Sequence, residues 1–521
     1  MKKQLWAIVF LGLAASAAAQ SPQVRIESGR LEGNVAGGVE SFLGIPYAVA
    51  PVGPLRWAAS HAAQPWREVR PAKAYGADCM QEPVPGDAAP LGTKPAEDCL
   101  FLNVWRPAGT AANAALPVLV WIHGGGNVNG GSSPAVYKGD AFARDGVIMV
   151  SFNYRVGRFG FFAFPEVTRQ NADYGRFANY GYMDTIDALS WVKRNIAALG
   201  GDPAKVTVYG QSAGAGQVQM LLSTPLAQGL FARAIIQSGG EQPRPPFKSE
   251  GGTSTIEQAG VNFAKRWGIE GTDFDALAKL RALTPEQIVD GLNLATMDAQ
   301  SSTYIGPVRD GRVLVSTLVE AVAQKRAHKV PLIIGSTSGD SARPVGADIN
   351  EAIAAFGRNA TQARAAYVKR GVDPAVAMRE ISRDRTYAEP ARFIAASLTA
   401  QGQPVYRYRF SYAAASVRGE MTEGATHASD IPYAMETVKD RYGDKTTPQD
   451  IAMAQMVHKY WVNFVRTGDP NGPGLPRWDA YDPKGDMLMD FAANGTPRAQ
   501  KDPFKARLDA AAALAGRAPP Q

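Results

Sequence analysis

Short runs of β-branched and other apolar residues alternate with helical patterns along much of this 521-residue chain. Runs of this kind, bounded by Gly, Pro or Asn, are typical of buried strands. The predicted strands are residues 118–122, 147–153, 206–209, 234–237, 332–335 and 405–410. Helices are predicted over residues 183–198, 213–222 and 448–466. Strands that alternate with helices favour an α/β fold, in which helices flank both faces of a large, mostly parallel sheet.

Two later stretches, residues 241–330 and 345–400, carry helical patterns but few strands. We expect them to be helical insertions at the rim of the sheet, over the edge that carries the functional site. The sequence has no repeat and no low-complexity linker. Length alone would suggest about three domains, but large α/β enzymes often form one. Residues 20–521 are therefore predicted to be a single domain.

The N-terminus has the three parts of a secretory signal peptide. Lys2 and Lys3 precede an apolar stretch over residues 5–13, and small residues follow over 14–19. An N-terminal membrane anchor is the alternative, but a spanning helix needs about 20 apolar residues. We expect residues 1–19 to be removed and the mature protein to be secreted or periplasmic, without a membrane span.

The charged residues exclude some classes of partner. The formal net charge of +7 falls to +5 without Lys2 and Lys3, and the chain has no stripe of Lys and Arg. So weak a field does not favour binding to nucleic acid or to an anionic membrane. The sequence also lacks an H-E-x-x-H motif and a paired-cysteine motif. Neither a metal ion nor an organic cofactor is therefore expected.

Two cysteines, Cys79 and Cys99, lie about twenty residues apart. An even number of cysteines in an exported chain favours a disulfide, here one that closes a surface loop. The alternative is a pair of free, buried thiols.

A G-x-S-x-G motif spans residues 210–214, between a predicted strand and a predicted helix. A serine at a sharp strand-to-helix turn adopts a strained backbone, so the residues two positions away must be small. The helix behind Ser212 also points N–H groups at the site, where they favour developing negative charge. The motif predicts a nucleophilic serine. The alternative is a glycine-rich turn with an incidental serine.

A second glycine-rich motif, Trp-Ile-His-Gly-Gly-Gly, spans residues 121–126 at the end of a predicted strand. Consecutive glycines let a loop approach a substrate carbonyl and direct N–H donors at its oxygen. Such a loop could instead bind phosphate, but the sequence has neither a G-x-G-x-x-G spacing here nor a Walker lysine. An oxyanion motif followed by a serine elbow is the order expected of an α/β-hydrolase.

The catalytic base is predicted to be one of the five histidines of the chain. His427 lies in a polar, Gly-containing loop after the strand 405–410, and such loops carry the functional groups of sheet enzymes. The others are expected to be structural or solvated: His61, His123, His328 and His458.

In this fold the acid lies between the serine and the histidine along the chain. Asp340 follows the strand 332–335, which brings its carboxylate to the same edge of the sheet as Ser212. Asp310 and Asp430 remain alternatives as the third member of the triad.

Together these motifs resemble the type B carboxylesterase family, which includes cholinesterases and bacterial para-nitrobenzyl esterases. The resemblance runs from about residue 24 to about residue 490. Further similar segments are residues 42–48, 97–104, 179–181, 184, 191–192, 200–203, 237–239, 463–464 and 468–471. The resemblance implies Ser212 as nucleophile, His427 as base, Asp340 as acid, Gly125, Gly126 and Ala213 as oxyanion donors, and a Cys79–Cys99 disulfide.

Three positions depart from the family pattern. Gln211 replaces the more usual Glu before the serine, and Asn127 follows the glycines where an aromatic residue is common. Residues 339–341 read Gly-Asp-Ser where Asp-Glu-Gly is typical. Asn127 makes that wall of the site more polar.

We therefore predict a serine carboxylic-ester hydrolase that acts on small-molecule esters through an acyl-enzyme. An amidase or carbamate hydrolase with the same triad is the first alternative. A noncatalytic binding protein of the cholinesterase type is the second, but such proteins typically lack the serine or the histidine. The sequence does not predict an oligomeric state.

Overall fold

The structure is a computed structural model that describes residues 21–170, 178–240 and 255–518. The predicted signal peptide over residues 1–19 lies outside the described residues, as do residues 241–254 of the first predicted insertion. No helix in the described ranges is long and apolar enough to cross a bilayer.

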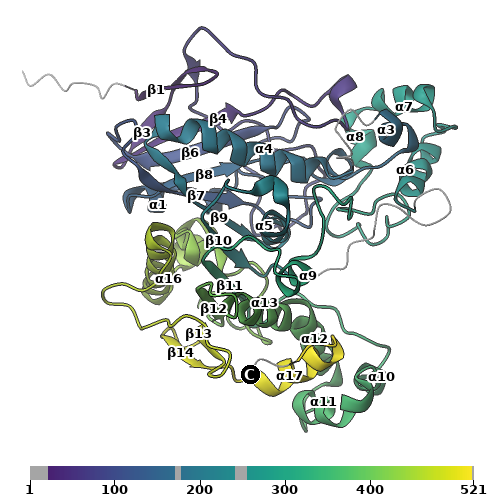
Figure 1. The fold of residues 1–521 in the computed structure, drawn as a ribbon, viewed down its shortest axis with the longest axis vertical. Coiled ribbons are helices and arrows are strands. Elements are labelled where there is room, and N and C mark those ends of the chain that lie inside the picture. The colour runs from purple at the N-terminus through teal and green to yellow at the C-terminus, as the bar shows by residue number, and fades with distance from the viewer. Residues whose placement is uncertain (1–20, 171–177, 241–254, 519–521) are drawn as a thin grey trace, which may run out of the picture.

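A twisted sheet of eleven strands runs through the described part of the molecule (Figure 1). Its spatial order is β14-β13-β12-β11-β10-β9-β7-β8-β6-β4-β3. In chain order the strands are β3 (Asn34–Ala36), β4 (Val39–Pro46), β6 (Phe101–Pro107), β7 (Leu116–Ile122), β8 (Ile148–Phe152), β9 (Gly201–Gln211), β10 (Arg233–Gln237), β11 (Leu332–Thr337), β12 (Val405–Phe410), β13 (Met487–Phe491) and β14 (Pro497–Lys501). A small second sheet contains β1 (Gln23–Ile26), β2 (Gly29–Glu32) and β5 (Arg70–Pro71).

The central strands, from β8 across to β13, pair in parallel. The six predicted strands correspond to β7–β12, which confirms the mostly parallel sheet. Both edges are antiparallel, through β3, β4 and β6 on one side and the β13–β14 hairpin on the other. Strands β3 and β14 were not predicted, because they are partly exposed and mix polar with apolar residues.

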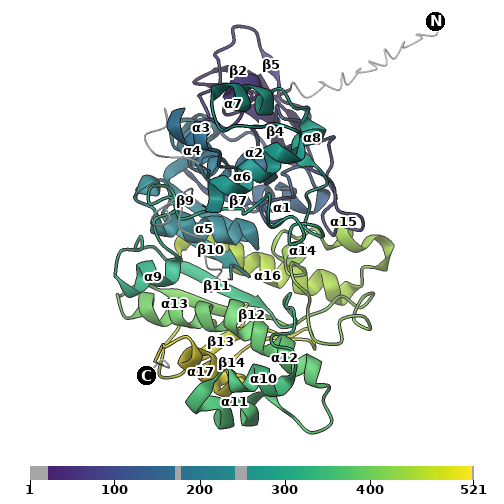
Figure 2. The same cartoon turned by 90° about the vertical axis from the view of Figure 1, so that its right-hand side faces the viewer.

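Helices cover both faces of the sheet (Figures 1 and 2). In chain order they are α1 (Asp140–Arg144), α2 (Gly157–Gly160), α3 (Pro165–Gln170), α4 (Tyr180–Asn195), α5 (Ala213–Ser223), α6 (Thr255–Arg266), α7 (Phe274–Arg281), α8 (Pro285–Val289), α9 (Leu318–Ala323), α10 (Ile349–Ala354), α11 (Ala360–Tyr367), α12 (Pro374–Arg383), α13 (Glu389–Thr399), α14 (Ile431–Ala434), α15 (Val438–Tyr442), α16 (Pro448–Thr467) and α17 (Lys505–Leu514). The three predicted helices correspond to α4, α5 and α16.

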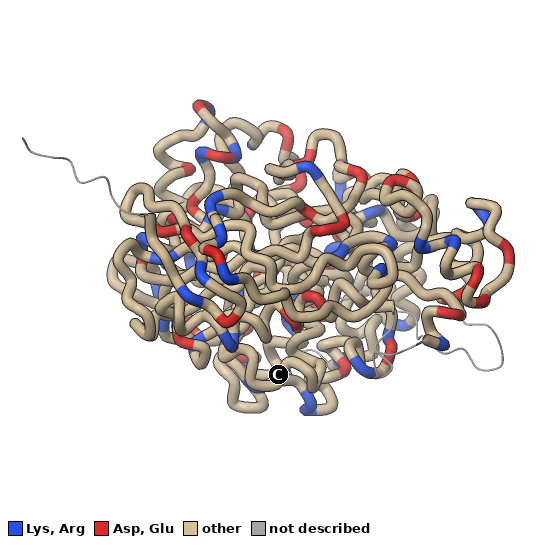
Figure 3. The backbone as a smooth tube through the Cα atoms, turned by 90° about the horizontal axis from the view of Figure 1, so that it is seen from above, with Lys and Arg blue, Asp and Glu red and all other residues tan. Residues whose placement is uncertain are grey.

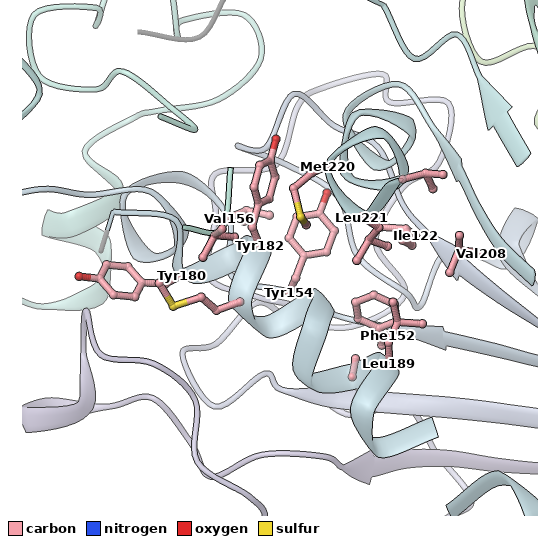
Figure 4. Close-up of a cluster of buried hydrophobic side chains, with 14 of the residues drawn as sticks. Ile122, Phe152, Tyr154, Val156, Tyr180, Tyr182, Leu189, Val208, Met220 and Leu221 are labelled. Carbon is pink, nitrogen blue, oxygen red and sulfur yellow. The ribbon is translucent and has the colours of Figure 1, made fainter. Parts of the chain in front are cut away.

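Alternating side chains along each strand divide the core between the two faces. Val118 and Val120 of β7 lie in a cluster with residues of α4, α5, α9 and α13. Leu119 and Trp121 of the same strand lie in a second cluster with residues of α1, α14 and α16. Figure 4 shows part of the first cluster, in which Leu189 of α4 lies near Phe152 of β8. The sheet is therefore buried on both faces, as a parallel sheet requires.

Helix α16 illustrates how local sequence sets the ends of an element. The Thr447 side chain accepts a hydrogen bond from the Asp450 backbone N–H, and the Asp450 carboxylate accepts one in return. This capping box begins the helix. Gly468 ends it in the left-handed region, with φ of 85°.

The two predicted insertions are helical, but they differ in their packing. Helices α10, α11 and α12 build a small core of their own with the C-terminal helix α17 (Figure 2). Helix α13, from the same stretch of 345–400, instead packs on β12 and covers the face of the sheet. The expectation that this whole stretch lies at the rim was therefore wrong for α13, whose apolar face is buried against the sheet.

Cys79 and Cys99 form a disulfide, with their Cα atoms 4.8 Å apart. Both residues are buried, and the loop that they close carries Asp87 and Ala89 to the wall of a cavity of about 1040 Å³. Elsewhere, Lys and Arg are interspersed with Asp and Glu along the chain (Figure 3).

Replacing both cysteines with serine is expected to lower the free energy of unfolding. The disulfide joins residues 20 positions apart, and a loop of that length contributes roughly 3 kcal/mol in the chain-entropy model. Denaturant unfolding of the double variant and the wild type, both without reductant, measures the difference. Equal stabilities, or two titratable thiols in the wild type, would contradict the expectation.

Candidate active site

Ser212 lies at the turn between β9 and α5, with φ of 56° and ψ of −124°. A non-glycine residue in this conformation is strained, and such residues cluster at functional sites. The turn is held in place by a hydrogen bond of 2.9 Å from the Ser212 N–H to the Gln237 carbonyl, at the end of the adjacent strand β10.

The glycines of the motif are required by close backbone contacts. A Cβ atom on Gly214 would lie 2.1 Å from the Ile122 carbonyl oxygen at the end of β7. A Cβ atom on Gly210 would lie 2.3 Å from the Gly214 carbonyl oxygen. Neither distance leaves room for a side chain, so α5 can start directly against β7 only with glycine at both positions.

The glycine-rich loop after β7 lies beside this turn. Gly125 and Gly126 have φ of 104° and 64°, which suits glycine. Among the described residues, neither donates its N–H to a hydrogen bond, and both line the cavity of about 1040 Å³ together with Ala213. Ala213 is the first residue of α5, so its N–H has no acceptor within the helix. The loop and the helix start thus present N–H donors to one cavity.

Asp340 and His427 are brought together by two loops. Asp340 follows β11 and accepts a short hydrogen bond at Oδ1 from His427 Nδ1. Its other oxygen, Oδ2, accepts a hydrogen bond of 2.6 Å from the Ser238 hydroxyl. The loops themselves are joined, because the Gly339 N–H donates to the Ala425 carbonyl at 2.8 Å. The carboxylate is therefore fixed from two sides.

The contact between Asp340 and His427 shifts the pKa of both groups. Burial opposes ionisation of Asp340, but the charge of His427 and its hydrogen bond lower the pKa of the carboxyl below its ordinary value. Burial also opposes the charged form of His427, but Asp340 raises the pKa of the imidazole above its ordinary value of 6.5. Asp340 is thus ionised across the pH range in which His427 titrates.

The second ring nitrogen of His427 contacts Gln211, the residue before Ser212. The Gln211 amide nitrogen lies 3.2 Å from His427 Nε2. Among the described residues, the Ser212 hydroxyl makes no hydrogen bond with the ring. Ser212 and His427 nonetheless line the same cavity, whose volume is about 1040 Å³.

The alternative acids have other partners. Asp310 accepts backbone hydrogen bonds from Arg312, Val313 and Leu314, as expected of a turn residue. Asp430 is buried, and its Oδ2 accepts hydrogen bonds of 3.0 Å from Gln237 and Tyr408. Burial and the charge of Asp340 raise the pKa of Asp430 to about 7.

The other histidines lie in structural or exposed positions. His123 is buried and stacks on Tyr154, with ring centroids 4.2 Å apart, which holds the start of the glycine-rich loop. His458 is buried in α16 and contacts the Ala434 carbonyl. His328 donates a hydrogen bond from its ring to the Thr224 carbonyl at the end of α5, and His61 is exposed.

Sequence reasoning missed three residues around the acid. Ser238 binds Asp340, and its positive φ of 50° is a signal that appears only in the structure. Arg383 donates a hydrogen bond of 2.9 Å to the Asp340 carbonyl. Tyr387 lies in a π-helical turn (Asp384–Ala388) and brings its ring centroid to 5.9 Å from that of His427. Such turns often occur at functional sites.

A strained serine after a central parallel strand, a glycine-rich loop beside it and a histidine–carboxylate pair on neighbouring loops define an α/β-hydrolase. The sequence matches the carboxylesterase family model over residues 20–373 and 362–510. The chain belongs to this family.

Known relatives agree with that assignment. The chain is 30% identical to the fumonisin B1 esterase of Sphingopyxis macrogoltabida, over 93% of this chain and 89% of that protein. It is 32% identical to carboxylesterase 1E of Mus musculus, over 89% and 87% of the two chains. The solved structure of PNB esterase matches with a TM-score of 0.78 at 26% identity, covering 94% of this chain and 99% of that one. The chain is a carboxylic ester hydrolase.

Replacing Gly214 with alanine is expected to destabilise the protein, because the added methyl group would overlap the Ile122 carbonyl. Overpacking of this kind costs on the order of 1–3 kcal/mol. Gly216, two residues along α5, is the matched control, since a Cβ atom there meets nothing within 4 Å. We expect Gly216→Ala to be neutral or stabilising by up to about 1 kcal/mol. Thermal unfolding of the two variants measures the difference in stability. Equal melting temperatures would contradict the argument from backbone packing.

Proposed function

We propose that this carboxylic ester hydrolase acts through a Ser212–His427–Asp340 triad and an acyl-enzyme intermediate. The observation that carries the proposal is that His427, which contacts Asp340, lines the same cavity as the strained Ser212. Gly125, Gly126 and Ala213 are proposed as the oxyanion donors, because they line this cavity beside the serine.

The reaction follows from these roles. His427 Nε2 takes the Ser212 proton while the serine oxygen attacks the ester carbonyl, and the three N–H groups stabilise the oxyanion. The alcohol leaves with the proton from His427. Water then attacks the acyl-enzyme by the same route and releases the acid. Asp340 holds the proton on Nδ1 and stabilises the imidazolium that forms in each step.

We also propose that the protein acts outside the cytoplasm, secreted or periplasmic. The pattern of residues 1–19 supports export. The Cys79–Cys99 disulfide supports it independently, because disulfides persist in oxidising compartments. Protease protection of the protein in intact and permeabilised cells tests this location.

Ser212→Ala is expected to lower the rate of ester hydrolysis by on the order of 10⁶-fold. A fluorophosphonate should label the wild type at Ser212 and leave the variant unlabelled, which separates an enzyme from a binding protein. Matched ester and amide substrates then separate an esterase from an amidase. Activity above a few per cent in clean variant protein would contradict the role of Ser212.

Asp340→Asn is expected to lower the rate by roughly 10⁴-fold, because the amide can favour the wrong imidazole tautomer. Asp310→Asn is the matched control, since its turn contacts use an oxygen that asparagine keeps and only the hydrogen bond from Asn179 to the other oxygen is lost. Asp430→Asn is a second control, because the raised pKa of Asp430 leaves much of it neutral at pH 7. Each control should cost less than about 100-fold. A larger loss of rate in either control than in Asp340→Asn would assign the role of the acid to that residue instead.

A further inference from the structure

Gln211 is the last residue of β9, and its side chain points to the base rather than away from the site. Its side chain is 2% exposed, and its amide nitrogen lies 3.2 Å from His427 Nε2. Its amide oxygen lies on the side of the glycine-rich loop, where a Cβ atom on Gly124 would be only 3.1 Å away. The amide is therefore confined between that loop and the imidazole.

The chemistry of the two groups determines which form of His427 this contact favours. Nδ1 of the ring donates to the Asp340 carboxylate, so the proton of the neutral ring is on Nδ1. Nε2 then carries a lone pair and accepts a hydrogen bond from the amide N–H. A protonated ring would present a second N–H to the same amide donor. The contact is thus favourable only with the neutral base.

We propose that Gln211 is a positioning residue that holds His427 with Nε2 unprotonated and directed at the site, so that the enzyme works at lower pH than a carboxylate at this position would allow. The proposal rests on the proposed role of His427 as the base. The serine hydroxyl, on the next residue of the chain, approaches the same lone pair and replaces the amide when the reaction begins.

Two carboxylates near the ring favour its protonated form, in contrast to the Gln211 amide. Asp340, from the loop after β11, and Asp430, just before α14, both favour the imidazolium. Tyr387 contacts the ring from the π-helical turn with its aromatic face and carries no charge at neutral pH. Arg383 reaches the backbone of Asp340 and is paired with Glu423. The Gln211 amide is accordingly the neighbour that favours the neutral ring through a hydrogen bond at Nε2.

The test compares kcat/KM against pH for an ester substrate in the wild type and three variants. In Gln211→Glu, a carboxylate next to Nε2 stabilises the imidazolium, and opposite charges at such distances shift titrations by about one to three pH units. We expect the midpoint of the acid limb to rise by about one pH unit or more, with at least a tenfold loss of kcat/KM below the midpoint and a smaller loss at high pH. In Gln211→Leu, which removes the donor without adding charge, the midpoint should rise by less.

Gln219→Glu is the matched control. It adds the same charge on α5, but Gln219 does not line the cavity that contains His427, so its midpoint should stay at that of the wild type. An unchanged midpoint in Gln211→Leu would overturn the proposal, whatever Gln211→Glu does, because the amide donor would then have no effect on the ring. A lower midpoint in Gln211→Leu would also overturn it, since it would mean that the amide presents its oxygen. An equal rise of the midpoint in Gln219→Glu would show that the added charge causes the shift wherever it lies. This result would also overturn the proposal.

Fluorophosphonate labelling at high pH keeps this test separate from the proposed function. Labelling of Ser212 in the Gln211 variants, with an unchanged acid limb, refutes the role of Gln211 alone. A wild type that is not labelled refutes the role of Ser212, whatever the variants do. If Gln211→Glu does not fold, as thermal unfolding would report, the direction of the shift in Gln211→Leu decides the question.

Discussion

The site depends on a close backbone contact between the start of α5 and the end of β7. Gly214 lies so near the Ile122 carbonyl that no side chain fits between them. The serine and the glycine-rich loop follow different strands. This contact holds them within a few ångströms of each other. An α5 displaced by the thickness of one methyl group would separate the Ser212 hydroxyl from the N–H groups of the glycine-rich loop.

The parallel pairing of the strands brings the other side chains of the site together. Strands β9, β10, β11 and β12 are neighbours and end at the same edge of the sheet. Ser212, Ser238 and Asp340 follow the first three of these strands, and His427 lies on the loop after the fourth. A chain of hydrogen bonds runs from Ser238 through Asp340 to His427 and then to Gln211. The imidazole is therefore contacted at both ring nitrogens, by Asp340 at Nδ1 and by Gln211 at Nε2.

The parts that could be predicted from the sequence are those dictated locally. Fully buried strands such as β11 are continuous apolar runs, and the turn at Ser212 carries its own glycines. The edge strand β14 was missed because three of its five residues are exposed. Contacts such as that of Gln211 with His427 join residues 216 positions apart, and no local pattern reports them. The packing of α13 on the sheet was missed for the same reason.

The wide spacing of these groups along the chain has a consequence for biogenesis. Asp87 and Tyr442 line the same cavity although most of the sequence lies between them. Contacts of such long range are costly in loop-closure entropy and form slowly during folding. A nascent or partly folded chain therefore has no assembled site, and its exposed serine is an ordinary alcohol. With the proposed triad, hydrolysis begins only after β12 and the loop behind it have docked, so catalytic activity would also report that this part of the fold has formed.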